Sequence, residues 1–125
     1  MDLSTAYKSH VEWRVLLKNA IRTGEKLDVA NIKRDDCCDL GKWLHGEGKG
    51  LYGTKPEFVK LVEVHHVFHR ETAIVATAIN ELDHDTANEM MDMSRAFGRA
   101  SLDVGTAINA LKVAVGYRCN PTINT

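Results

Sequence analysis

Residues 54–82, TKPEFVKLVEVHHVFHRETAIVATAINEL, decide the fold of this chain. Thr54 and Glu57 have the spacing of a capping box, and Pro56 between them suits the first turn of a helix. Apolar residues then continue at helical spacing as far as Leu82. They are Phe58, Leu61, Val62, Val64, Phe68, Ile74, Val75, Ala78 and Ile79. The pattern predicts one long amphipathic helix that starts at Thr54 and ends near Leu82.

A further long helix is predicted on each side of this stretch. The first covers Ser4–Arg22, with Ser4 as the N-cap and Gly24 in the stop signal. The other covers Thr86–Gly116, and Glu89 completes a second capping box at its start. No strand-like alternation separates these helices, so the chain is expected to be all-α.

Residues 25–52 interrupt the helical pattern, because four glycines lie between positions 41 and 50. They surround a short apolar stretch that contains Cys38 and Trp43, where we expect one short helix. The predicted fold is therefore an antiparallel four-helix bundle of three long helices and one short Cys-bearing helix. With 125 residues the chain is expected to form a single domain over positions 1–125.

Charge and composition limit the classes of partner. The chain carries 16 Lys and Arg against 17 Asp and Glu, for a formal net charge of −1. This balance argues against nucleic acid and against an anionic membrane as partners. The first twenty residues contain neither a signal-peptide core nor a spanning segment, so we expect a cytoplasmic protein. Three cysteines, two of them adjacent, form a poor disulfide framework and suit reduced thiols.

Histidines and one cysteine form a candidate metal site. His65 and His69 are four residues apart in a predicted helix, so both imidazoles project from one face, whereas His66 is directed elsewhere. His10 lies one turn before a tryptophan on the first helix and is a candidate third ligand. Cys38, at the edge of the short helix, is a candidate fourth. Three imidazole nitrogens and one thiolate suit tetrahedral zinc.

Each of these residues also has a purely structural interpretation. A histidine pair at this spacing is more often solvated or part of a core, and an isolated histidine such as His10 is more often a half-buried polar residue. Cys38 alone is more often a small buried hydrophobic residue. The joint occurrence of the four residues changes this balance.

Three blocks of sequence carry a family resemblance: HVEWR from His10, CDLGKWL from Cys38 and HHVFH from His65. Together they resemble the bacterial chemoreceptor zinc-binding domain, over about positions 7 to 115. The resemblance implies one zinc ion, held by His10, Cys38, His65 and His69 inside a helical bundle. It also implies a homodimer that regulates a chemoreceptor or a diguanylate cyclase. Two features depart from the family: Cys37 adds a second thiol, and these 125 residues include no signalling module.

The expected function is a non-enzymatic sensor. A zinc ion with four protein ligands leaves no position for substrate, and the chain lacks a His-Glu-x-x-His arrangement. The resemblance implies two inputs, zinc availability and oxidation of the zinc-bound cysteine by hypochlorous acid, with output to chemotaxis or cyclic-di-GMP machinery. One alternative is a hemerythrin-like di-iron oxygen carrier or sensor, which needs more inward histidines and bridging carboxylates. Another is a structural helical adaptor with incidental histidines.

Overall fold

The computed structural model describes residues 2–92 and 95–116. Within these ranges the chain forms seven α-helices and one π-helix and contains no strand, which confirms the all-α class. The elements are α1 (Leu3–Thr23), α2 (Val29–Lys33), α3 (Asp39–His45), α4 (Glu47–Tyr52), α5 (Pro56–Asn80), α6 (His84–Met90), α7 (Ala96–Leu111) and the π-helix Lys112–Gly116.

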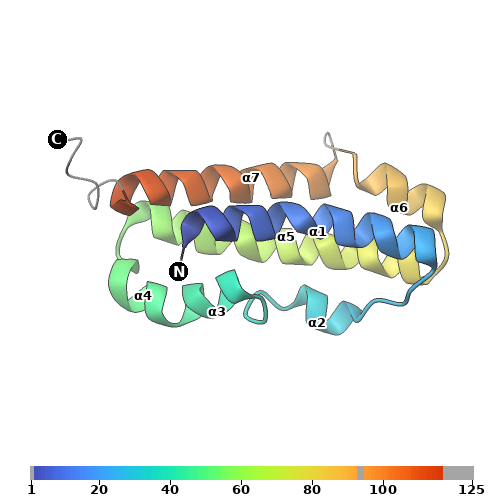
Figure 1. Cartoon of the computed structure of the whole chain (residues 1–125), viewed down its shortest axis with the longest axis horizontal. Coiled ribbons are helices and arrows are strands. Elements are labelled where there is room, and N and C mark those ends of the chain that lie inside the picture. Colours follow the sequence, from blue (N-terminus) through green and yellow to red (C-terminus); the bar gives the residue numbers. More distant parts are fainter. Residues whose placement is uncertain (1, 93–94, 117–125) are drawn as a thin grey trace.

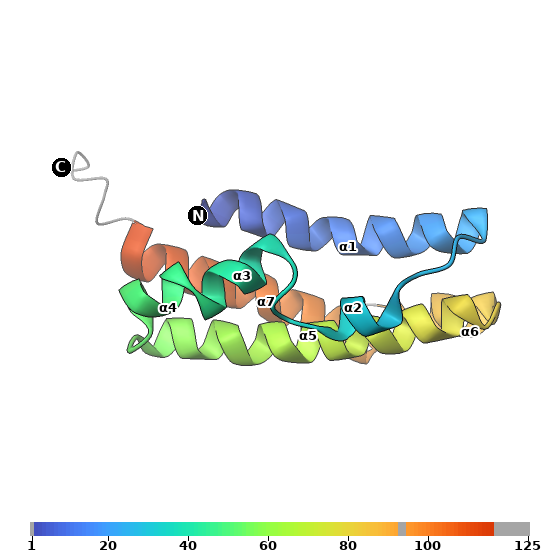
Figure 2. The same cartoon turned by 90° about the horizontal axis from the view of Figure 1, so that it is seen from below.

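Three long helices, α1, α5 and α7, lie along one another, and α2, α3 and α4 carry the chain back from the end of α1 to the start of α5 (Figure 1). Figure 2 shows that α1 and α5 run in the same direction, whereas α7 runs in the opposite one, so the predicted antiparallel four-helix bundle is not confirmed. Three short helices thus occupy residues 25–52, where one short helix was predicted. The extra helices, α2 and α4, are five and six residues long, too short for a periodic pattern to reveal.

The ends of the long helices differ by a few residues from the predicted ends. Asp2, not Ser4, caps α1, because its carboxylate accepts the N–H of Ser4 at 2.9 Å. Gly24 ends α1 as predicted, in the left-handed conformation with φ of 75°. Lys55 is the N-cap residue of α5, and no side chain forms a capping hydrogen bond there. The capping box predicted at Thr54 is therefore wrong.

The predicted final helix is broken after Met90. Met91 is fully buried and ends α6. Its carbonyl oxygen accepts a hydrogen bond from the guanidinium of Arg14 on α1, in place of the helical N–H that a continuous helix would supply. α7 then begins at Ala96. The predicted cap at Thr86 is also wrong, since Asp83 caps α6 and accepts the N–H of Thr86.

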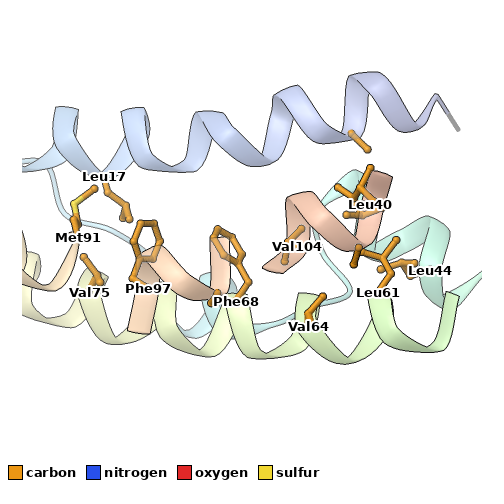
Figure 3. Close-up of a cluster of buried hydrophobic side chains, with 14 of the residues drawn as sticks. Leu17, Leu40, Leu44, Leu61, Val64, Phe68, Val75, Met91, Phe97 and Val104 are labelled. Carbon is orange, nitrogen blue, oxygen red and sulfur yellow. The ribbon is translucent and has the colours of Figure 1, made fainter. Parts of the chain in front are cut away.

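Buried apolar side chains from all the long helices fill the interior (Figure 3). At one end Leu17 lies near Phe97, and at the other Leu40 and Leu44 from α3 lie next to Leu61 from α5. Burying one leucine side chain contributes about 1.5–3 kcal/mol, so these two leucines hold α3 against α5. No helix within the described ranges has the length and hydropathy needed to cross a bilayer.

Candidate metal centre

His65 and His69 lie one turn apart in the middle of α5, and both side chains are buried. Their Nε2 atoms are 3.1 Å apart. The helical spacing alone brings the two imidazoles together, because residues i and i+4 share a face. Their neighbour His66 lies outside this cluster, with an exposed side chain.

His10 reaches the same point from α1. Its side chain is only 6% exposed, and its ring centroid lies 5.2 Å from that of His65 and 4.3 Å from that of Phe68. Ring nitrogens of His10, His65 and His69 all lie within 4.8 Å of one another. Leu17 and Ala20 are buried on α1 with His10, so the face that supplies the core also supplies this histidine.

Cys38 is the N-cap residue of α3, and its sulfur faces the histidine pair. The Sγ atom lies 3.3 Å from Nε2 of His65 and 3.5 Å from Nε2 of His69. It also accepts the backbone N–H of Gly41 at 3.3 Å, the bond expected at a helix N-terminus. The start of α3 therefore both positions the sulfur and offers it a hydrogen bond that favours the thiolate.

Gly41 explains the glycine in the CDLGKWL block. A Cβ atom at this position would lie 1.9 Å from the carbonyl oxygen of Asp35, which is backbone and has little room to move. The segment before α3 crosses directly over α3 at this point, so only glycine allows the crossing.

Two tryptophans, one from the HVEWR block and one from the CDLGKWL block, pack around the site. Trp13 on α1 makes an edge contact with His69, with ring centroids 5.5 Å apart. Trp43 on α3 packs against Phe58 on α5, and Gly48 on α4 leaves room for its indole ring. Both contacts join neighbouring elements to α5.

A hydrogen bond orients the imidazole of His69, whereas ring nitrogens of His10 and His65 have no hydrogen-bond partner among the described residues. Nδ1 of His69 lies 2.8 Å from the carbonyl oxygen of Ile32, so it carries the proton and leaves Nε2 as a free donor atom. Both ring nitrogens of His10 and Nδ1 of His65 are buried with no hydrogen-bond partner among the described residues. Buried polar atoms are normally satisfied, and a metal ion bound through one ring nitrogen would supply such a partner to His10.

Burial keeps the three imidazoles neutral. It lowers the pKa of His10 to about 3 and the pKa of His65 to about 2, and repulsion from His69 acts in the same direction. Burial also lowers the pKa of His69 and raises the pKa of the Cys38 thiol. At neutral pH the histidines are ready to bind a metal, and the thiol gives up its proton on binding.

The donor set and its spacing fit zinc. A tetrahedral zinc ion with ordinary bond lengths separates two nitrogens by about 3.3–3.4 Å and a nitrogen from a sulfur by about 3.6 Å. The observed separations among Cys38, His65 and His69 are 3.1, 3.3 and 3.5 Å. The cluster of possible metal ligands found in the described part of the chain consists of His10, His65 and His69, without a carboxylate. A di-iron centre needs carboxylates that bridge the two irons.

A second cluster, formed by Asp35, His45 and His66, was not predicted from the sequence. Asp35 lies 3.1 Å from Nδ1 of His66 on α5 and 3.4 Å from Nε2 of His45 on α3. The carboxylate thus links the segment before Cys38 to both helices. The sequence carries no local signal for it, since Asp35 has neither helical spacing nor a motif relation to the two histidines.

The four residues expected from the sequence, His10, Cys38, His65 and His69, are thus brought together from α1, the start of α3 and α5. In a comparison with protein families, the model of the chemoreceptor zinc-binding domain matches residues 10–76, more than half of the 125-residue chain. This range begins at His10 and includes the other three residues. No curated protein and no solved structure matches the chain.

Proposed function

We propose, since this chain belongs to the chemoreceptor zinc-binding domain family, that its zinc ion is held by His10, Cys38, His65 and His69 in a non-enzymatic sensory domain. The single observation that carries the assignment is that the buried imidazole of His10, whose ring nitrogens have no hydrogen-bond partner among the described residues, lies beside the other three donors. The residues of the whole chain, 1–125, act together as one sensor domain in this proposal.

The chemistry of the residues supports a sensing role. A bound zinc ion supplies a crosslink between chain segments that are far apart in sequence. His65 and His69 belong to α5 and stay in place with or without metal, because their helix is part of the core. Cys38 stands at the start of a seven-residue helix, so this ligand is the one whose loss most easily frees a segment.

Two inputs act on Cys38 in the proposal. Low zinc availability leaves the thiol protonated, because burial raises its pKa. Hypochlorous acid oxidises the thiolate to a sulfenic acid, which is a poor zinc ligand. Either input releases Cys38, and the segment that leads into α3, from the histidines. The output goes to chemotaxis or cyclic-di-GMP machinery, through a chemoreceptor or diguanylate cyclase partner in the cytoplasm.

A homodimer is part of the proposal. Tyr7, Val11 and Val15 follow one another at four-residue spacing along α1 and are 41%, 51% and 57% exposed. An exposed apolar stripe of this kind supports helix-to-helix pairing between two copies. Sedimentation of the zinc-loaded protein measures the state, and a monomer at all concentrations would contradict it.

Metal analysis of the purified chain tests the zinc assignment. We expect one zinc per chain, and we expect His69→Ala to weaken zinc binding strongly because water must complete the ligand set. His66→Ala is the matched control, since this neighbour on α5 lies outside the cluster. Two irons per chain would favour the di-iron alternative, and no metal would favour a structural adaptor. Zinc at wild-type affinity in both His65→Ala and His69→Ala would place the site elsewhere.

A further inference from the structure

A cavity of about 440 Å³ lies between the first half of α1 and the turn that leads into α3. Its wall includes two of the four proposed zinc ligands, His10 and Cys38, together with Ser9 and Cys37. His10 lines it with a side chain that is nine-tenths buried and whose ring nitrogens have no hydrogen-bond partner in the described part of the chain. The cavity therefore reaches the donor cluster directly.

The residues that line this cavity suit the passage of a cation to the proposed zinc ligands. Asp2 and Asp39 contribute carboxyl groups, and no lysine or arginine is found among the described residues that line the cavity. Cys37 is a half-buried residue of the same wall, its Sγ lies 3.7 Å from the Asp36 carboxylate, and Cys38 directly follows it in the chain. Thiolates bind zinc more strongly than carboxylates bind it in such sites, so Cys37 is the best ligand ahead of the donor cluster.

A second cavity provides a comparison. It has a volume of about 230 Å³ and lies between α1 and α7, where Tyr7, Ser101 and Gly105 line it. It also touches His10 but reaches none of the other three donors. It contains no thiol and no carboxylate among its lining residues. The first cavity is therefore the better route for zinc.

We propose that zinc enters and leaves through the α1–α3 cavity and that Cys37 is its transient ligand there, handing the ion to Cys38 and taking it back. This inference rests on the proposed zinc assignment. In each exchange one thiolate–zinc bond forms as another breaks, the ion remains Zn²⁺, and the thiol proton passes to or from water. Cys37 takes no part in the final ligand set, which His10, Cys38, His65 and His69 complete.

Stopped-flow measurements of zinc uptake and release test the route on the full chain. Uptake is followed after zinc is mixed with metal-free protein, and release after loaded protein is mixed with an excess of a colorimetric chelator. Cys37→Ser removes the transient ligand, and Ser9→Tyr fills the cavity. We expect each to slow both rates about tenfold, equivalent to about 1.4 kcal/mol of activation free energy. The equilibrium affinity stays unchanged because a route affects both directions equally.

Ser101→Tyr is the matched control, because it adds the same bulk to the second cavity and is expected to leave both rates unchanged. Unchanged rates in Cys37→Ser would overturn the inference, and so would a loss of equilibrium affinity in Cys37→Ser, which would make it a permanent ligand. If circular dichroism shows that Ser9→Tyr does not fold, Cys37→Ser decides alone. A wild-type chain that binds no zinc would instead refute the proposed function.

Discussion

Acid should destabilise the metal-free protein through His10 and His65. In the folded chain burial holds their pKa values at about 3 and about 2, whereas an unfolded histidine has a pKa of 6.5. The unfolded state therefore binds more protons than the folded state at every pH between these values, and stability falls as the pH falls below the unfolded pKa.

The size of the effect follows from proton linkage. Between about pH 8 and about pH 5 each of the two histidines should remove about 2 kcal/mol from the free energy of unfolding, or about 4 kcal/mol together. His69 adds to the loss, since burial also lowers its pKa. Cys38 does not titrate in this range, because its pKa lies above the ordinary value of 9.0. A loss of this size is a large share of the stability of a small domain, which is about 5–15 kcal/mol.

Urea unfolding of the chelator-treated protein, followed by circular dichroism across this pH range, measures the loss. His10→Gln should reduce the pH-dependent loss by about 2 kcal/mol, the share of one buried histidine. His66→Gln is the control, since it replaces a histidine of the same helix whose side chain is exposed and lies outside the buried cluster. A free energy of unfolding that stays constant over this range would refute the reasoning, because it would mean that the imidazoles are hydrated in the folded chain.

Three further predictions concern metal, packing and oxidation. A strong chelator should lower the melting temperature of the zinc-loaded protein, because zinc binds only the folded state; an unmoved transition would show that zinc acts on the Cys38 segment alone. Gly41→Ala should destabilise the fold by about 1–3 kcal/mol and weaken zinc binding, because its Cβ would meet the Asp35 carbonyl. Gly50→Ala, with nothing within 4 Å, is the control for thermal unfolding, and equal melting temperatures would contradict the packing argument. Limiting hypochlorous acid should oxidise Cys38 and release zinc together, as peptide mass mapping detects; zinc release with Cys38 still reduced would defeat the redox role.

Local pattern accounts for the parts of the fold and site that the sequence predicts well. The helix expected over residues 54–82 is α5, Pro56–Asn80, because its periodicity is long and its first turn contains Pro56. The meeting of His65 and His69 needs only the helical repeat. Cys38 was predicted as a ligand from the CDLGKWL motif. The close contact between Gly41 and the carbonyl oxygen of Asp35 explains the glycine in this motif.

Features that depend on contacts between distant segments were missed. At the break after Met90, the guanidinium of Arg14 on α1 donates to the carbonyl oxygen of Met91, and the local sequence around neither residue indicates this contact. Gly48 of the short helix α4 lies directly against the indole ring of Trp43 on α3, a contact between two helices that spacing within one helix does not predict. The carboxylate of Asp35 meets its two histidines only after α3 and α5 have packed. Sequence spacing within one helix carries no information on such pairs.

X-ray absorption at the zinc edge of the loaded full chain tests the ligand assignment most directly. Three histidines and Cys38 predict a shell of three nitrogens at about 2.0–2.1 Å and one sulfur at about 2.3 Å. Cys38→Ser should remove the sulfur from this shell, and Cys37→Ser should leave it in place. A shell without sulfur, or one with two sulfurs, would contradict the proposed site.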